Sequence, residues 1–318
     1  METMTQIPNS EVNEKGRILN DWNKEFLERH NLLGHVYLRT QDKIYYPYWK
    51  SQLNRNSIAK QELERIGQDL QKDNIKVFLL KGFSLMGEIY KDWGERFVSD
   101  IDLLISYQEL WKLTDILKMY GYQKRKEAKW LENRHKHIFV KKTDDIQISI
   151  EIHTQLFWHA SLNISDKPEI ANVKGFYQLS RENQLIHLCG HLAFQHSFSK
   201  LFWLMDIFKY VDRYKDKIDW NVFWEQAEKA GLYKSCFFTL FLCQKLGLNI
   251  QTIVYRAKKK KKISVFLLKK LVDYSYLYNP EKHPVRRLAT KFLIKDSILD
   301  NIRYAYAWLR TFNKRRHT

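Results

Sequence analysis

Two aspartates one residue apart stand at the start of an apolar run. The segment DIDLLI, residues 100–105, predicts a buried strand that carries Asp100 and Asp102 at its beginning. Alternate residues of a strand point to the same side, so both carboxylates are expected to face one way. Two carboxylates this close repel each other unless a cation lies between them, and Mg²⁺ prefers oxygen ligands. The pair therefore predicts a divalent-cation site.

A third acidic residue alternates with isoleucines farther along the chain. HKHIFVKK and IQISIEIHT flank the turn signal TDD and predict a hairpin, whose second arm carries Glu151 on the same face as His153. If that arm pairs near the strand at 101–105, Glu151 completes a three-carboxylate site for one or two Mg²⁺ ions. His153 then either supports Glu151 from the same face or has no part in the site.

A lysine–glycine pair ends another short apolar run, VFLLKGFS. Gly82 would let backbone amides approach a phosphate closely, and a strand, a turn and a helix in this order favour anion binding. Lys81, Ser84 and Arg96 are the side chains expected to supplement that binding. For Arg96 the alternative is a structural ion pair with a neighbouring or buried carboxylate, and for Lys81 it is a solvated strand end.

Histidines recur in the second half of the chain. His187 and His191 are four residues apart on one predicted helix, and Asp206 lies on the next. This spacing permits a zinc site. A substrate-facing or nucleotide-facing role and simple hydrogen bonding within the core are the alternatives, because the flanking residues are apolar and no general-base glutamate accompanies the pair.

The elements that carry these residues indicate an α+β protein. Strand and helix periodicities alternate up to about residue 170, whereas the pattern is helical almost throughout from residue 180. With 11 glycines and 5 prolines in 318 residues, long helices with short connections are expected. We predict an N-terminal helical or irregular segment at 1–50, a mixed-sheet core at 51–170, and a helical C-terminal domain at 171–318 with a basic end.

The segment IKVFLLKGFSLMGEIYKDWGERFVSDIDLLIS, residues 75–106, resembles the uncharacterised nucleotidyltransferase family of the DNA polymerase beta superfamily. IEIHTQLFW at 150–158 is similar to the family's later acidic element, and 185–210 is similar to its H-x-x-x-H and Trp-Leu-x-Asp helices. Most of the superfamily has serine after the turn glycine, where this chain has Phe83. The resemblance spans about residues 55–215 and implies a polymerase-beta-like core with flanking helices.

The resemblance also implies an activity, Mg²⁺-dependent nucleotidyl transfer. In that reaction an acceptor hydroxyl or phosphate attacks the α-phosphorus of a nucleoside triphosphate and pyrophosphate leaves. Asp100, Asp102 and Glu151 would hold two Mg²⁺ ions, with Mn²⁺ as a possible substitute, and Glu151 would accept the acceptor's proton. Lys81 and Gly82, or Arg96 with Gly82, would bind the triphosphate. The acceptor, whether a small molecule, a protein or RNA, does not follow from the motifs.

Positive charge is concentrated at the C-terminal end. Residues 256–318 contain 18 Lys and Arg but 4 Asp and Glu, which is a net charge of +14 out of +18 for the whole chain. This predicts an anionic partner, either nucleic acid or an acidic membrane surface. The alternative function is accordingly a catalytically idle protein that binds such a surface through its basic C-terminal helices.

The location expected from the sequence is cytoplasmic. The first residues show no basic segment followed by an apolar stretch, and the three cysteines form no CxxC pair. Peripheral attachment to a membrane, through aromatic residues with basic flanks near the C-terminus, is the second possibility.

Overall fold

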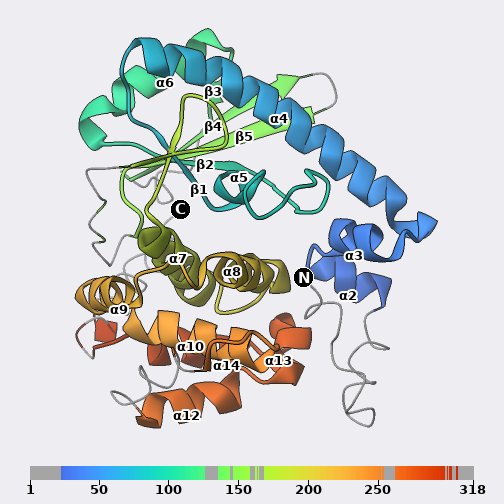
Figure 1. Cartoon of the computed structure of the whole chain (residues 1–318), viewed down its shortest axis with the longest axis vertical. Helices are drawn as coiled ribbons and strands as arrows, with labels where there is room; N and C mark the ends of the chain where they lie inside the picture. The colour runs from blue at the N-terminus through green and yellow to red at the C-terminus, as the bar shows by residue number, and fades with distance from the viewer. Residues whose placement is uncertain are drawn as a thin grey trace, which may run out of the picture.

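The computed structural model describes residues 23–125, 135–143, 146–157, 162, 164, 168–251, 253, 262–297, 299, 301–302 and 306. The chain forms a sheet with helices on both faces and further helices stacked beyond one of them (Figure 1). The predicted α+β class, with a mixed sheet followed by a helical C-terminal region, is confirmed.

The described residues form one seven-stranded sheet with the order β3-β4-β5-β2-β1-β7-β6. The strands are β1 (Phe78–Leu80), β2 (Ile101–Leu104), β3 (Gln123–Lys124), β4 (Lys136–Thr143), β5 (Ile146–His153), β6 (Glu169–Ile170) and β7 (Tyr177–Gln178). Strand β2 is antiparallel to β1 and parallel to β5, so the sheet is mixed. The predicted hairpin is the antiparallel pair β4–β5.

The α-helices precede, interrupt and follow the strands. They are α2 (Lys24–Arg29), α3 (Leu33–Thr40), α4 (Tyr46–Lys72), α5 (Lys81–Leu85), α6 (Leu110–Met119), α7 (Arg181–Gly190), α8 (Leu201–Tyr214), α9 (Trp220–Lys229), α10 (Tyr233–Lys245), α12 (Lys262–Leu271), α13 (Tyr274–Tyr278) and α14 (Pro284–Leu293). A π-helical turn, η3 (His191–Gln195), continues α7, and short 3₁₀ turns lie at Lys43–Tyr45, Tyr107–Glu109 and Pro280–Lys282.

Two hydrophobic cores lie on opposite faces of the sheet. On one face, the isoleucines of β5 and alternate residues of β2 pack with α4 and α6. On the other face, Leu80 and Leu104 pack with the large helical core of α7, α8, α9 and α10. Because side chains alternate along a strand, burial of Ile101 and Leu103 against α4 and α6 turns Asp102 toward α7 and α8. Apolar packing therefore fixes the side of the sheet on which the acids lie.

Helix α4 and the sheet extend past the two predicted ends of the core, 51 and 170. Helix α4 begins at Tyr46, a few residues before the expected start of the core at 51. Strand β7 pairs with β1, so the sheet includes residues beyond the expected end of the core at 170. The division into three domains stays a prediction, and much of the lysine-rich segment 256–262 lies outside the described residues. Within the described ranges, no helix has the length and apolar character needed to cross a bilayer.

Candidate active site

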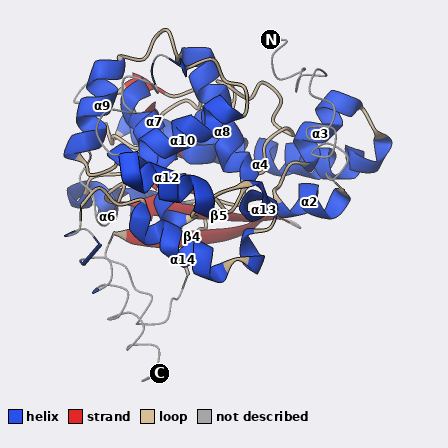
Figure 2. Ribbon diagram, turned by 90° about the horizontal axis from the view of Figure 1, so that it is seen from below, coloured by secondary structure: helices blue, strands red, loops and turns tan. Residues whose placement is uncertain are grey.

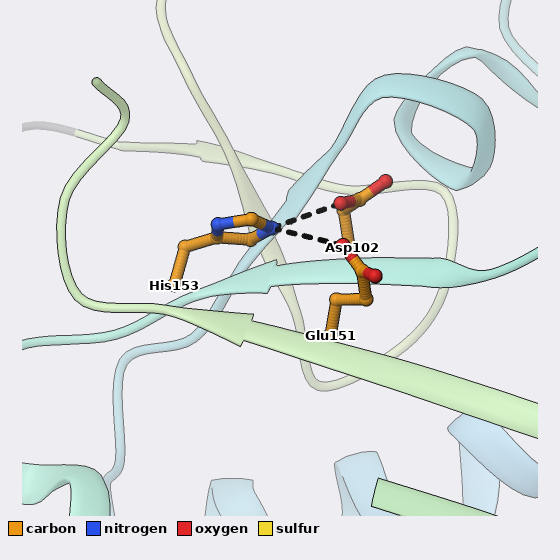
Figure 3. A group of neighbouring side chains, drawn as sticks. All are labelled: Asp102, Glu151 and His153. Carbon is orange, nitrogen blue, oxygen red and sulfur yellow. Dashed lines mark hydrogen bonds and ion pairs between the residues drawn. The ribbon is translucent and has the colours of Figure 1, made fainter. Parts of the chain in front are cut away.

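Two carboxylates and an imidazole meet where β2 and β5 run side by side. The parallel register places Asp102 opposite Glu151 and Leu104 opposite His153. The Nε2 atom of His153 lies 2.9 Å from Oδ1 of Asp102 and 3.8 Å from Oε2 of Glu151 (Figure 3). One donor atom from each residue lies within 4.8 Å of the other two, which is a group that could hold a metal ion. The expected convergence of Glu151 on the Asp102 strand is thus present.

Two lysines contact these carboxylates. The Nζ atom of Lys81 lies 2.6 Å from Oδ1 of Asp102, and that of Lys136 lies 2.7 Å from Oε2 of Glu151. Burial would raise the pKa of Asp102, but Lys81 and the hydrogen bond from His153 hold that pKa well below its usual range. Asp102 therefore stays ionised throughout the physiological pH range.

Asp100 differs from Asp102 in its surroundings. It lies one residue before β2 begins, so the alternation of the strand does not fix its direction. Its Oδ1 accepts a hydrogen bond of 2.7 Å from the Ser99 hydroxyl. Burial, together with the charge of Asp102, raises the pKa of Asp100. Among the described residues, the group that could hold a metal ion contains His153 where the sequence had suggested Asp100, although Asp100 lines the same cavity. The predicted ligand role of Asp100 stays a prediction.

A cavity of about 350 Å³ opens over the carboxylates, between the sheet and the helical layer. One wall is charged and comes from α5, the loop before β2, and strands β2, β4 and β5. The opposite wall comes from η3 and α8 and carries aromatic rings and an amide but no acid. The lining residues are Lys81, Gly82, Arg96, Phe97, Val98, Ser99, Asp100, Asp102, Lys136, Glu151, His191, Gln195, His196, Phe202 and Trp203.

The guanidinium of Arg96 is engaged with the protein. Its Nε and Nη2 atoms donate to the two oxygens of Asp206 at 2.8 and 2.6 Å, and Nη1 donates to the Phe97 carbonyl at 2.9 Å. The Tyr90 hydroxyl also donates to Asp206, at 2.7 Å. This is the structural ion pair that the sequence left open as the alternative for Arg96. It also shows that Asp206, on α8, holds the loop before β2, and the phosphate-binding role of Arg96 stays a prediction.

Gly82 and Ser84, expected to bind phosphate, both contact other protein groups. Ser84 is buried, donates to the Lys81 carbonyl at 2.7 Å and accepts from the Gln184 amide at 2.6 Å, and it does not line the cavity. A Cβ atom on Gly82 would lie 2.6 Å from Nη1 of Arg96. Gly82 therefore allows the helix α5 to pass close to the Arg96–Asp206 pair, while the phosphate-binding roles of Gly82 and Ser84 stay predictions.

Two histidines of the helical layer, His191 and His196, form part of the uncharged wall. The Nε2 atoms of His191 and His196 lie 3.1 Å apart, and the His196 ring lies 3.7 Å from the Trp203 ring, measured between centroids. Burial lowers the pKa values of His187 and His196 to about 3, so both rings are neutral near pH 7. Over the described ranges, neither His187 nor His191 belongs to a metal-binding group, and Asp206 is paired with Arg96.

Sequence reasoning missed Lys136 and placed no weight on the aromatic wall. A signal for Lys136 was available, because the hairpin register can be counted back from the pair Thr143–Ile146 to Lys136–His153. That count puts Lys136 on the face that carries Glu151 and His153. Trp203 and Gln195 had no comparable signal, because their approach to the sheet depends on how α7, η3 and α8 pack.

Comparisons with known proteins identify the family of the chain. The model of a family described as uncharacterised nucleotidyltransferase matches residues 25–247. A nucleotidyltransferase-like antigenic protein from Paracoccidioides brasiliensis is similar in its solved structure, with a TM-score of 0.40 and 13% identity over 62% of this chain and 91% of that one. No curated protein matches the sequence. The family match covers well over half of the chain, and the chain therefore belongs to the uncharacterised nucleotidyltransferase family.

Proposed function

We propose that the protein is a Mg²⁺-dependent nucleotidyltransferase, which moves a nucleoside monophosphate from a nucleoside triphosphate to an acceptor hydroxyl or phosphate and releases pyrophosphate. The observation that supports this most is the pairing of Asp102 with Glu151 on neighbouring strands at the floor of the cavity. Family membership supports the reaction class. The proposed acceptor is a small molecule, a protein or RNA.

The carboxylates of the site fit a hard divalent cation, because Mg²⁺ and Mn²⁺ prefer oxygen ligands. Carboxylate oxygens of Asp102 and Glu151 and the imidazole of His153 converge within 4.8 Å, and Asp100 lies beside them in the same cavity. Bound Mg²⁺, or Mn²⁺ in its place, would stabilise the charge on the attacking and leaving oxygens. We assign metal binding to Asp100, Asp102 and Glu151, in a site for one or two ions, with His153 as a hydrogen-bond partner of Asp102.

Other steps of the proposed reaction, proton transfer and substrate binding, are assigned to residues that line the cavity. Glu151 is 13% exposed at its side chain, against 5% for Asp102, so Glu151 is the carboxylate better placed to accept a proton from the acceptor. Lys81 is the cation expected to contact the triphosphate. The neutral rings of His196 and Trp203 offer a stacking surface for the uncharged part of a substrate, because aromatic faces bind planar groups without requiring charge.

A labelling experiment tests the proposed function. The wild-type chain is incubated with each of the four α-³²P-labelled ribonucleoside triphosphates, Mg²⁺ and a cell extract as the source of acceptor. Asp102→Ala is expected to lower label transfer by about three orders of magnitude or more because the cation loses a ligand. Asp115→Ala, which removes an exposed aspartate on α6, is the matched control. Label transfer that persists in Asp102→Ala would contradict the proposal.

A second candidate function is peripheral attachment to an acidic membrane through the C-terminal helices. Helices α12 and α14 lie together on the face seen in Figure 2. They expose Phe266 (57%), Val285 (79%) and Leu288 (47%), and the exposed Lys270 lies beside Phe266. Exposed apolar side chains among cations favour a bilayer surface over nucleic acid, which needs no apolar contact of this kind. The cytoplasmic location stays a prediction.

Vesicle flotation tests this attachment. The protein is mixed with vesicles of phosphatidylserine and phosphatidylcholine, and a Val285→Asp, Leu288→Asp variant serves as the comparison. We expect the wild type to float with acidic vesicles and the variant to stay at the bottom. Equal behaviour of the two proteins, or binding to RNA in a gel shift without vesicle binding, would contradict membrane attachment.

A further inference from the structure

Lys136 occupies an unusual position for a surface lysine. It is the first residue of β4, directly opposite His153 in the hairpin, and it lines the cavity over the carboxylates. Its ammonium group lies 2.7 Å from Oε2 of Glu151, and 36% of its side chain is exposed. An ammonium group at this distance forms a charge-assisted contact with a carboxylate that is also a donor for the proposed cation. Lys136 and the cation therefore compete for Glu151.

Lys81 makes the corresponding contact with Asp102 from the other side of the site, but its side chain has less room to move. Only 12% of the Lys81 side chain is exposed, and its backbone has a φ of 47°, in the left-handed region that non-glycine residues seldom adopt. Lys81 is thus held in place at the start of α5. Lys136 is more exposed, at 36% of its side chain, and rotation about its side-chain bonds can carry the ammonium group away from Glu151 without moving β4.

The charges at the site indicate where that ammonium group goes. A divalent cation bound between Asp102 and Glu151 would repel an ammonium group that stayed against the same carboxylate. A nucleoside triphosphate carries several negative charges, and it would lie in the cavity that Lys136 already lines. If Lys136 leaves Glu151 for a phosphate oxygen, it is paired with an anion both in the free protein and in the complex with cation and nucleotide.

We infer that Lys136 pairs with Glu151 in the free protein and binds the triphosphate in the complex. The free protein therefore binds a divalent cation weakly and takes it up together with the nucleotide. This inference rests on the proposed function and adds an order of binding to it. Lys136 acts as a counter-ion in the free state and as a phosphate ligand in the complex. The same side chain thus opposes cation binding when nucleotide is absent and supports nucleotide binding when the cation is present.

The test is a pair of binding measurements on Lys136→Met, which keeps the length of the side chain and removes its charge. Mn²⁺ binding without nucleotide is measured by electron paramagnetic resonance. Binding of the non-hydrolysable α,β-methylene analogue of ATP with saturating Mg²⁺ is measured by calorimetry. We expect Mn²⁺ to bind about five- to tenfold more tightly and the analogue to bind about tenfold more weakly, because loss of one unit charge changes the two equilibria in opposite directions.

Two further variants serve as controls. Lys141→Met removes a lysine of the same strand that pairs with Glu62 at 2.5 Å outside the cavity lining, and it should change neither affinity. Lys136→Arg keeps the charge and should keep Mn²⁺ binding as weak as in the wild type. Melting curves confirm that all variants fold. Unchanged or weaker Mn²⁺ binding by Lys136→Met would overturn the inference, and so would unchanged analogue binding.

The failure of this inference can be told apart from the failure of the proposed function. Asp102→Ala and Glu151→Ala are measured in the same Mn²⁺ experiment. If they abolish Mn²⁺ binding while Lys136→Met behaves like the wild type, the metal site is supported and the inferred exchange of Lys136 between Glu151 and the triphosphate is wrong. If neither alanine variant changes Mn²⁺ binding, the proposed metal site itself is wrong.

Discussion

Arg96 and Asp206 are 110 positions apart in the chain and form a buried ion pair with two nitrogen–oxygen contacts, at 2.8 and 2.6 Å. The pair joins the loop before β2 to helix α8. It therefore connects the strand that carries Asp102 with the helix that carries Trp203, and both of those residues line the cavity. The distance between the charged and the aromatic wall depends on this contact.

Removal of one partner should destabilise the protein strongly. We expect Asp206→Ala to lower the free energy of unfolding by about 3–5 kcal/mol, because Arg96 would remain buried without its counter-charge. The double variant Arg96→Met, Asp206→Leu should lose less than Asp206→Ala alone, since neither charge is left buried. Urea denaturation measures both. An equal loss in the single and double variants would show that the pair is not coupled as the geometry indicates.

A methyl group at position 82 should disturb the same contact. The added Cβ of Gly82→Ala would lie 2.6 Å from Nη1 of Arg96. That nitrogen donates to the Phe97 carbonyl, and the other two nitrogens of the guanidinium donate to Asp206. We expect a loss of about 1–3 kcal/mol in unfolding free energy, as is usual for overpacking in a tight interior. Label transfer should also fall. Gly247→Ala is the comparison without a steric clash, because no atom lies within 4 Å of its added Cβ. Any loss of stability in that variant comes from its positive φ of 102°.

Cation binding should distinguish Asp102, in β2, from Asp100, which precedes that strand. Asp102 belongs to the group whose donor atoms lie within 4.8 Å, and Asp100 does not. We expect Asp102→Asn to abolish measurable Mn²⁺ binding and Asp100→Asn to weaken it by about tenfold, because a ligand at the edge of a site contributes less than one at its centre. Electron paramagnetic resonance of added Mn²⁺ gives both values. Equal losses would place Asp100 within the central group.

The uncharged wall should affect substrate binding without affecting the cation. Trp203 lines the cavity next to His196 and opposite the carboxylates. We expect Trp203→Leu to raise KM for at least one substrate by about tenfold, since loss of aromatic stacking costs ~1–3 kcal/mol. Mn²⁺ binding should stay at the wild-type level. If KM is unchanged for both the nucleotide and the acceptor, the aromatic wall has no part in substrate binding.

Acidification should loosen the contact between α2, α8 and the C-terminal helices through His30. Its Nδ1 accepts from the Leu201 amide and its Nε2 donates to the Tyr278 carbonyl, each at 3.2 Å, which requires a neutral ring. Burial lowers the pKa of His30 to about 4 from 6.5. The unfolded chain therefore binds an extra proton between pH 6.5 and about 4, so stability from His30 is present above pH 6.5 and is lost as the pH falls toward 4.

Unfolding measured across that pH range tests the contribution of His30. His30→Gln keeps a donor for the Tyr278 carbonyl and cannot be protonated. Its free energy of unfolding should depend less steeply on pH between 4 and 6.5, by up to about 1.4 kcal/mol per pH unit, which corresponds to one proton. Other buried histidines with lowered pKa values, such as His196, remain in both proteins and cancel in the comparison. Identical slopes would contradict the role assigned to His30.

Much of the local structure follows from residue patterns alone. The apolar alternation of β5 predicts that Glu151 and His153 share one face, and the helical periodicity beyond residue 180 predicts α7, α8, α9 and α10. The hairpin register also gives the position of Lys136, because one pair of opposite residues near the turn fixes every later pair. These features depend on neighbours in the sequence, whose geometry is set by the backbone.

The site as a whole depends on contacts between distant segments. The sequence supplied Asp102 and Glu151 as candidates, but only the parallel pairing of β2 with β5 placed them opposite each other. The sequence alone also did not decide whether Arg96 pairs with a phosphate or with Asp206. A charged side chain pairs with the opposite charge that the packing of the helices brings near it. Periodicity reports which face of an element is buried, whereas the partner that covers that face is decided by the packing of the whole chain.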